Sequence, residues 1–287
     1  MITNSKLRVS LVIPVYNEES YLALCLEAIA QQTVSPFEVI VVDNNSSDNT
    51  VEIASRYPFV RLLHESRQGV VYAREHGFNA TRGDIIGRID ADTVLDPSWI
   101  QKTQEVFSDP LISVATGKVC YHELSLARLA NVIDLAARRY LAWRLGREVA
   151  IQGANMALRR STWERIRGGM CHQRGMHEDY DIAIHANQSG GRVVFDERMV
   201  ASLGYRLADI DYRQFREYCY ISPRTYFQHG LKSGREMYPV VWLVLACYLP
   251  LKFLRSGYDS RLDRFSLKRL FTATVKPRVN PATYGDF

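Results

Sequence analysis

The feature that most constrains the fold of this 287-residue chain is an alternation of apolar strand-like runs with helical runs along its first hundred residues. Strands are predicted at 9–15, 37–42, 60–64 and 84–89, and helices at 18–31, 50–56, 71–80 and from Pro97, with Asp96 as its cap. This alternation predicts an α/β fold with a largely parallel sheet flanked by helices. Because ligands of such sheets bind beyond the carboxyl ends of the strands, the residues after each strand are the candidates for a site.

The first two strands end in polar residues. Pro14-Val15-Tyr16-Asn17-Glu18 follows the first strand and has the residues of a helix entrance, with Asn17 as the cap. Asp43 opens the polar stretch DNNSSDNT after the second strand. A turn explains this stretch, because Asn, Asp and Ser bond their own backbone, but Asp43 is also placed to bond a nucleobase edge.

The fourth strand ends in Asp90-Ala91-Asp92. Residues two apart on an extended chain point to the same side, so both carboxylates can face one site. Two adjacent carboxylates repel each other unless a cation or hydrogen-bond donors lie between them. Mg²⁺ takes one or two protein carboxylates and completes its shell with water and substrate phosphates. The pair therefore suggests a divalent-cation site, although the tripeptide Asp-x-Asp is common by itself.

A second acidic group, His177-Glu178-Asp179-Tyr180-Asp181, stands at the predicted start of a later helix. Asp179 or Asp181 would serve as an ordinary helix cap, or the carboxylates could take part in chemistry. Upstream, the stretch from Gly153 to Gly169 predicts a strand, a short helix and a tight turn.

These motifs form an ordered set: VSLVIPVYNEE, VIVVDNNSSDNT, GVVYAREHGFNATRGDIIGRIDADT, GANMALRRSTWERIRGG and HEDYDIAIHANQSGG. In order and spacing the set resembles the inverting glycosyltransferases of family 2, which have the GT-A fold. The resemblance covers about residues 8–205. We therefore expect a GT-A domain over residues 1–232 and a helical, apolar and basic extension over residues 233–287.

The resemblance implies a role for each matching residue. It places these residues at the nucleotide, with Asp43 accepting from the base: Pro14, Tyr16, Glu18, Asp43, Arg74 and Asp90. It makes Asp92, with Asp90, the ligand of Mg²⁺ or Mn²⁺, a cation that neutralises charge on the leaving nucleoside diphosphate. It makes Asp179 the general base that takes the acceptor's hydroxyl proton in a single inverting displacement. Gly153, Asn155 and Glu178 are implied on the acceptor side.

Two departures and two alternatives bear on this reading. Asn44-Asn45 follows Asp43 where many relatives have Asp-Gly, and no Gln-x-x-Arg-Trp motif of the processive synthases is present, which favours a single transfer. A sugar-1-phosphate nucleotidyltransferase would instead open with a Gly-rich loop containing Arg, where this chain has PVYNEES. A non-catalytic sugar-nucleotide-binding protein would have little reason to keep Asp43, Asp92 and Asp179 together. The donor is expected to be a UDP- or GDP-sugar, and the acceptor a glycan, lipid-linked or soluble, or a polyprenyl phosphate.

Charge and cysteine usage indicate a location. Five scattered cysteines and an N-terminal apolar run interrupted by Pro14 predict a cytoplasmic chain without a signal peptide. The net charge of +5 lies entirely in residues 252–287, so the catalytic part is neutral and nucleic acid is not an expected partner. Residues 238–254 are strongly apolar but, at 17 residues, short of the roughly 20 that a spanning helix needs. We expect the apolar and basic segments together to hold the enzyme on an anionic membrane face without spanning it, or else to pack on the core.

Overall fold

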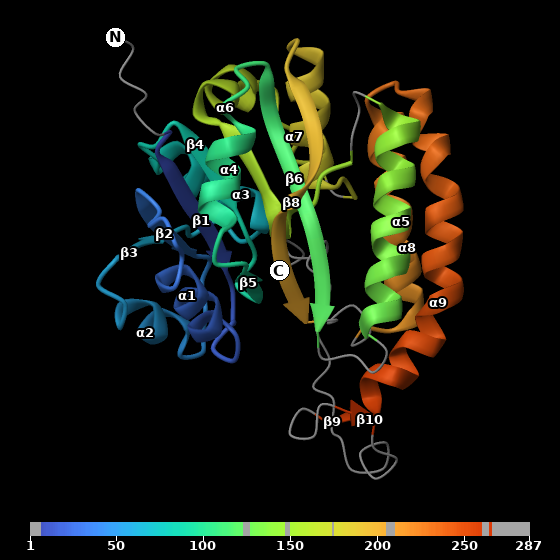
Figure 1. Cartoon of the computed structure of the whole chain (residues 1–287), viewed down its shortest axis with the longest axis horizontal. Helices are drawn as coiled ribbons and strands as arrows, with labels where there is room; N and C mark the ends of the chain where they lie inside the picture. The colour runs from blue at the N-terminus through green and yellow to red at the C-terminus, as the bar shows by residue number, and fades with distance from the viewer. Residues whose placement is uncertain are drawn as a thin grey trace.

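The computed structural model describes residues 7–122, 127–146, 150–173, 175–204, 210–259 and 264–265. A mixed sheet lies at the centre, and three long helices, α5, α8 and α9, form a separate group beside it (Figure 1). The elements, in chain order, are β1 (Val9–Val15), α1 (Leu22–Ala30), β2 (Glu38–Asp43), α2 (Thr50–Ser55), β3 (Val60–His64), α3 (Val70–Ala80), β4 (Ile85–Arg88), β5 (Thr93–Leu95), α4 (Trp99–Val106), β6 (Ile112–His122), α5 (Ala127–Leu145), η1 (Gly153–Asn155), β7 (Met156–Arg159), α6 (Arg160–Ile166), η2 (Arg167–Gly169), α7 (Glu178–Gln188), β8 (Arg192–Gly204), α8 (Tyr212–Gln228), η4 (Lys232–Met237), α9 (Tyr238–Ser256), β9 (Tyr258–Asp259) and β10 (Arg264–Phe265).

The strands of the main sheet lie in the order β3-β2-β1-β4-β7-β6-β8-β5. The half built from the first four predicted strands, β1 to β4, is parallel throughout, as the alternation of strand and helix requires. The other half is mixed: β7 is antiparallel to both β4 and β6, β5 is antiparallel to β8, and β6 is parallel to β8. The α/β prediction is confirmed, while the parallel character is confined to the first half and the β6–β8 pair.

Alternating side chains of β1 divide the core into two layers. Leu11 and Ile13 face the side covered by α1, α2 and α4, where Trp99 is fully buried. Val12 faces the opposite side, covered by α3, α6 and α7, where Trp163 is buried. A strand buried on both faces explains why 9–15 is apolar at every position except Ser10. The sheet is thus fixed between two helical layers, and its carboxyl edge is left open for a site.

Two predicted helix starts are wrong. α1 begins at Leu22, because Asn17 adopts a left-handed conformation (φ 53°) and its side-chain oxygen accepts from the Ser47 backbone N–H instead of capping the helix. α4 begins at Trp99, since the Asp96 carboxylate accepts from the backbone and hydroxyl of Ser98 and forms a turn before the helix.

The C-terminal helix differs from the prediction in length. η4 and α9 make a continuous helical stretch, Lys232–Leu254, of 23 residues, long and apolar enough to cross a bilayer by length and composition alone. The argument that the segment is too short to span is therefore wrong. One side of α9 packs on α8 through Val241 and Tyr248, whereas Trp242 and Leu249 are exposed. Most of the predicted basic tail, residues 260–263 and 266–287, lies outside the described residues.

Candidate active site

Arg88, the last residue of β4, is the centre of the polar site. Its side chain is buried, and its guanidinium contacts three carboxylates. Nη1 lies 2.9 Å from Asp179 Oδ1, and Nη2 lies 2.9 Å from Asp90 Oδ1 and 3.6 Å from Glu178 Oε1. One buried cation therefore joins the predicted metal side of the site to the predicted base.

Asp179 lies in the first turn of α7, but it does not cap that helix. The N-cap residue is His177, and the second Asp179 oxygen, Oδ2, accepts from the Gly153 backbone N–H at 2.7 Å. Burial raises the pKa of Asp179, and the Arg88 guanidinium opposes that rise. A fixed carboxylate with a raised pKa is a stronger proton acceptor than an exposed one. The capping explanation of Asp179 is thus excluded, and its environment suits a general base.

Gly153, at the start of η1, is required by this contact. A Cβ at this position would lie 1.1 Å from Arg88 Nη1 and 2.4 Å from Asp179 Oδ2. Only glycine lets the backbone N–H approach the carboxylate while the guanidinium stays on the other oxygen.

The site opens into a cleft of about 1130 Å³ along the carboxyl edge of the sheet. Most of the predicted site residues line it: Pro14, Tyr16, Glu18, Asp90, Asp92, Gly153, Glu178 and Asp179. Its other wall comes from the separate helical group, with Leu141 of α5, Phe215 of α8 and Val241 of α9. The cleft therefore has a polar side on the sheet and a largely apolar side on the helices, to which Arg138 and Tyr218 add polar groups.

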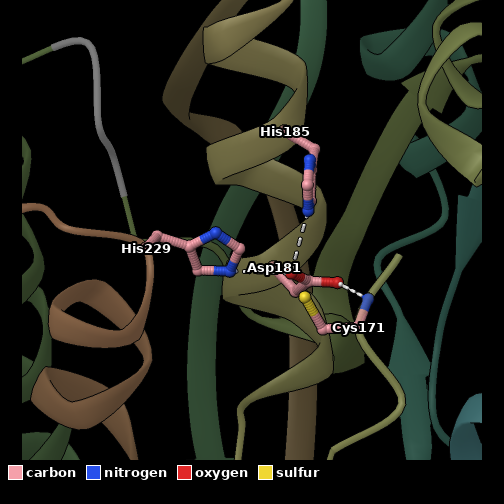
Figure 2. A group of neighbouring side chains, drawn as sticks. All are labelled: Cys171, Asp181, His185 and His229. Carbon is pink, nitrogen blue, oxygen red and sulfur yellow. Dashed lines mark hydrogen bonds and ion pairs between the residues drawn. The ribbon is translucent and has the colours of Figure 1, made fainter. Parts of the chain in front are cut away.

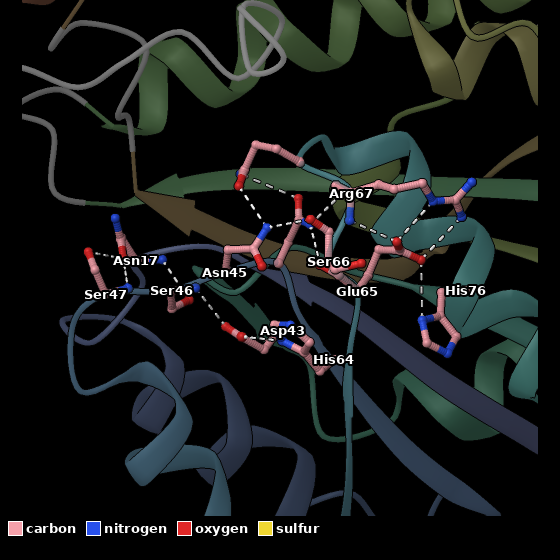
Figure 3. Close-up of polar contacts among 12 residues, drawn as sticks. Asn17, Asp43, Asn45, Ser46, Ser47, His64, Glu65, Ser66, Arg67 and His76 are labelled. Carbon is pink, nitrogen blue, oxygen red and sulfur yellow. Dashed lines mark hydrogen bonds and ion pairs between the residues drawn. The ribbon is translucent and has the colours of Figure 1, made fainter. Parts of the chain in front are cut away.

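Asp43 is buried and is not among the residues that line the cleft. Its Oδ1 accepts from the Ser46 backbone N–H at 3.1 Å, and its Oδ2 lies 3.1 Å from His64 Nδ1 (Figure 3). Asn44, the next residue, lines the cleft in its place. Of the predicted nucleotide residues, the structure thus brings Pro14, Tyr16, Glu18 and Asp90 to the cleft, whereas the Asp43 carboxylate bonds within its own loop.

Asn44 fixes the loop between β3 and α3. Its side-chain nitrogen donates to the carbonyls of Glu65 and Arg67, each at 2.8 Å, and its oxygen accepts from the Gly69 N–H at 2.7 Å. Glu65 is held in turn by Arg67 and His76 (Figure 3). The Asn that departs from the family pattern therefore has a structural role here, which its position in the sequence did not reveal.

Two other predicted site residues are buried outside the cleft lining. Arg74 is fully buried on α3, and its Nη1 donates to the Glu178 carbonyl at 2.9 Å, so it supports the first turn of α7. Asn155 is also fully buried, and it accepts from Trp99 Nε1 at 2.8 Å. The structure does not bring Arg74 or Asn155 into the cleft.

Asp181, the last acid of the HEDYD stretch, faces a different group. It is fully buried, its Oδ2 accepts from the Cys171 backbone N–H at 2.9 Å, and it lies beside His185 and His229 (Figure 2). It is not among the residues that line the cleft. The acidic motif is thus divided between the cleft and a second cluster.

Sequence reasoning missed Arg88 and Tyr218. Arg88 could have been found, because the alternation that puts Asp90 and Asp92 on one side also includes residue 88. Tyr218 lines the cleft from α8, beyond the stretch that resembles the family, so no motif marked it. Burial raises the pKa of Tyr218 well above its ordinary value, and its ring lies 5.1 Å from that of His177.

The cleft also offers ligands for a divalent cation. Asp90 and Asp92 both line it, and the Asp90 side chain is 43% exposed there despite its contact with Arg88. A set of carboxylate oxygens open to solvent and substrate fits Mg²⁺ or Mn²⁺, which keep positions for phosphate oxygens. His177, Glu178 and Asp179 form a further group of neighbouring ligand atoms at the start of α7.

Three features together define a transferase of the GT-A class: the mixed sheet, the cleft at its carboxyl edge, and the two acidic pairs in that cleft, Asp90 with Asp92 and Glu178 with Asp179. The family model described as glycosyl transferase family 2 matches residues 10–166. The chain belongs to this family, whose members transfer a sugar from a nucleotide sugar.

Individual relatives match over part of the chain. It is 32% identical over 126 residues to the uncharacterized glycosyltransferase YibD of Escherichia coli strain K12, which covers 42% of this chain and 37% of that protein. It is 34% identical over 113 residues to glycosyltransferase GlyG of Streptococcus pneumoniae serotype 4, covering 36% and 38%. It is also 31% identical over 107 residues to an Escherichia coli chondroitin synthase, covering 36% of this chain and 16% of the synthase. The chain thus matches well under half the length of these relatives.

Solved structures share the fold at low identity. The mannosyltransferase PcManGT of Pyrobaculum calidifontis, in complex with GDP-Man and Mn²⁺, has a TM-score of 0.59 at 20% identity and covers 94% of this chain and 79% of that one. Staphylococcus aureus TarS 1–349, in complex with UDP-GlcNAc, has a TM-score of 0.56 at 16% identity, with 86% and 72% covered. These likenesses establish the GT-A type of fold.

Proposed function

We propose that this family 2 enzyme is a metal-dependent inverting glycosyltransferase that makes one transfer from a UDP- or GDP-sugar to a hydroxyl or phosphate acceptor. The observation that carries the proposal is the Arg88 contact with both Asp179 and Asp90 at 2.9 Å on the floor of one cleft. A base and a metal ligand joined by one fixed cation lie within the reach of a single sugar and its diphosphate.

The sheet side of the cleft is proposed to hold the donor. Pro14, Tyr16 and Glu18 would contact the nucleoside, with Asp43 keeping its loop in shape, and Asp90 and Asp92 would hold Mg²⁺ or Mn²⁺ against the diphosphate. Such a cation supplies Lewis-acid stabilisation of the leaving group without a proton. The ligands named for PcManGT and TarS, GDP-Man with Mn²⁺ and UDP-GlcNAc, support this kind of donor and ion for the fold.

Asp179 is proposed as the general base. An acceptor hydroxyl entering from the helical side would meet its carboxylate, which Gly153 and Arg88 hold in one orientation. Asp179 takes the proton as the acceptor oxygen attacks the anomeric carbon opposite the leaving diphosphate, so configuration inverts in one step. Arg88 then keeps Asp90 and Glu178 as partners while Asp179 is neutral. Glu178 borders the acceptor.

The helical side of the cleft is proposed to receive a lipid-linked glycan or polyprenyl carrier. Its apolar wall includes Leu141 and Val241, and the same helices carry large exposed apolar side chains, with Trp143 at 73%, Trp242 at 60% and Leu249 at 66% exposed. A surface of this kind suits an interfacial position on an anionic leaflet. We keep the boundary at 232/233, with the extension contributing the α9 part of this wall and α5 and α8 the rest, and propose that the enzyme acts at the inner face of the membrane in cell-envelope glycan synthesis.

A donor-hydrolysis screen tests the proposal without knowledge of the acceptor. UDP- and GDP-sugars are incubated with the purified chain and Mg²⁺, Mn²⁺ or chelator, and release of the nucleoside diphosphate is followed. We expect hydrolysis of one donor class that needs the metal and is lost in Asp92→Ala, while Glu52→Ala, which removes an exposed carboxylate on α2, behaves as the parent. Full activity in chelator, or in Asp92→Ala, would contradict the proposal.

A further inference from the structure

A second cluster of potential metal ligands lies outside the cleft. Cys171 comes from the segment before α7, Asp181 and His185 from α7, and His229 from the residue that follows α8 (Figure 2). One ligand atom from each of the four side chains lies within 4.8 Å of all the others. Asp181 and His185 are one helical turn apart, so they face the same side of α7.

The cluster contains buried polar atoms without hydrogen-bond partners. Asp181 Oδ1 lies 2.9 Å from His229 Nε2 and 3.3 Å from His185 Nε2, within ion-pair distance. In the described part of the chain, however, none of these three atoms makes a hydrogen bond of acceptable geometry. The Asp181 side chain is 1% exposed and that of His229 is 9% exposed, and all three atoms are shielded from bulk solvent. Buried polar atoms are nearly always satisfied, and three unsatisfied ones that converge on one point indicate a common partner.

We propose that Cys171, Asp181, His185 and His229 form a four-ligand zinc site. Zinc binds sulfur at about 2.3 Å and nitrogen or oxygen at about 2.0–2.2 Å, so neighbouring ligands of a tetrahedral ion lie roughly 3.3–3.7 Å apart. The two separations of 2.9 and 3.3 Å are close to that spacing before an ion enters. A thiolate and two imidazoles select zinc over Mg²⁺, in contrast to the oxygen-only pair Asp90 and Asp92.

The surroundings of the ligands support this assignment. The Cys171 backbone N–H donates to Asp181 Oδ2 at 2.9 Å, which orients the carboxylate so that Oδ1 points at the two histidines. Hydrogen bonds of this kind from the surrounding shell usually orient metal ligands. The two imidazole rings are nearly perpendicular, at 87°, and present their Nε2 atoms from α7 and from the residue that follows α8.

The site would have a structural role that does not depend on the proposed reaction. Four protein ligands leave no open position for substrate, as in structural zinc sites. The ion would hold together the segment before α7, α7 itself and the end of α8. One of its ligands, Asp181, lies only two residues after Asp179. The ion would therefore hold the first turn of α7, and with it the catalytic carboxylate, against the helix that supplies Tyr218.

The test is metal analysis of the full chain. The protein is purified without chelator, incubated with Zn²⁺ and dialysed against excess Mg²⁺, and its metal content is measured by inductively coupled plasma mass spectrometry. We expect one zinc ion to be retained per chain. Cys171→Ser and His229→Gln should lose it, whereas Asp92→Ala and two matched controls, Cys247→Ser and His172→Gln, should keep it. Zinc retention in Cys171→Ser and His229→Gln equal to the parent, or a parent that retains none, would overturn the proposal.

A spectroscopic measurement on the unmutated protein covers the case in which a variant fails to fold. Co²⁺ added to the metal-free parent should give a thiolate-to-metal charge-transfer band and intense tetrahedral visible bands at one equivalent, and Zn²⁺ should abolish both. Chelator should lower the unfolding temperature of the zinc-loaded parent. A Co²⁺ spectrum without the thiolate band would exclude Cys171 as a ligand and overturn the four-ligand site.

Discussion

Replacing Gly153 by alanine tests the packing of the active site at its tightest point. The added Cβ would lie 1.1 Å from Arg88 Nη1, 2.3 Å from Arg88 Cζ and 2.4 Å from Asp179 Oδ2. Real Cβ atoms do not approach other atoms this closely, so the guanidinium must leave its position or the η1 backbone must move away. Either movement breaks the arrangement in which Arg88 and the Gly153 N–H hold the two oxygens of Asp179.

The cost follows from the contacts that are lost. Breaking a buried ion pair costs on the order of 3–5 kcal/mol. Arg88 keeps Asp90, which is 43% exposed, as a partner, so we take the low end, about 3 kcal/mol. At roughly 2–4 °C per kcal/mol for chains of this size, the unfolding temperature should fall by about 6–12 °C. Because a displacement near 1 Å of a catalytic group costs about 100-fold, metal-dependent donor turnover should fall by about that factor.

The matched control is Gly168→Ala. A Cβ at Gly168 meets no atom within 4 Å, so its free energy of unfolding should stay within about 0.5 kcal/mol of the parent and its turnover should be unchanged. Differential scanning calorimetry and the donor-hydrolysis rate are measured on both variants. If Gly153→Ala matches Gly168→Ala in both, the contact between Gly153, Arg88 and Asp179 does not organise the site.

Three further predictions follow from the same structure. Burial raises the pKa of Asp179, and the base is lost as pH falls through that pKa. The rate of transfer should therefore decline at a higher pH than it would with an ordinary aspartate as the base. A rate that stays constant down to the usual pKa range of a carboxylate would contradict this. Arg74→Lys should lower turnover and leave nucleotide affinity unchanged in calorimetry, because Arg74 supports the Glu178 carbonyl; a large loss of nucleotide affinity would restore a diphosphate role. In liposome flotation with anionic vesicles at low salt, Trp242→Glu and Leu249→Glu should each weaken binding by more than tenfold, as expected for about 1.5–3 kcal/mol per large apolar side chain. The control is Leu111→Glu, which should bind as the parent does, because Leu111 is 67% exposed but precedes β6, away from α9. Equal flotation of all variants would exclude the α9 face as the membrane contact.

The first half of the fold could be predicted because its signals are local. Each strand from β1 to β3 is an apolar run followed by a helix that leads back to the start of the next strand, so the strands β1 to β4 run parallel. β6, β7 and β8 pair across long stretches of sequence, so their mixed order leaves no periodic pattern. In the group of α5, α8 and α9, the sequence indicated one apolar run, residues 238–254. Its helix is longer than that run, because the polar residues from Lys232 onward are helical and continuous with α9.

The site was predictable where alternation or motif order determines it. Asp90, Asp92 and Glu178 reach the cleft with Asp179, as the ordered motifs indicate. Arg74 does not reach the cleft, and its position in the sequence could not show this. A charged residue in a predicted helix can face either a ligand or a buried carbonyl, and the local sequence is the same in both cases.

Other residues could not be assigned from local sequence at all. Asn44 and Tyr218 act through partners distant in sequence. His229 lies 44 residues beyond His185, at the end of a separate helix, so only the three-dimensional fold brings the two imidazoles together.

The most direct test of the account is the rate of sugar transfer by Asp179→Asn, measured with the donor identified by hydrolysis and a saturating acceptor. The substitution keeps the shape of the side chain and removes the proton acceptor, so transfer should fall by about 10²–10⁴-fold while calorimetry shows the parent's affinity for nucleotide and metal. Transfer at the parent rate would contradict the assignment of Asp179 as the base and, with it, the catalytic role of the Arg88-centred site.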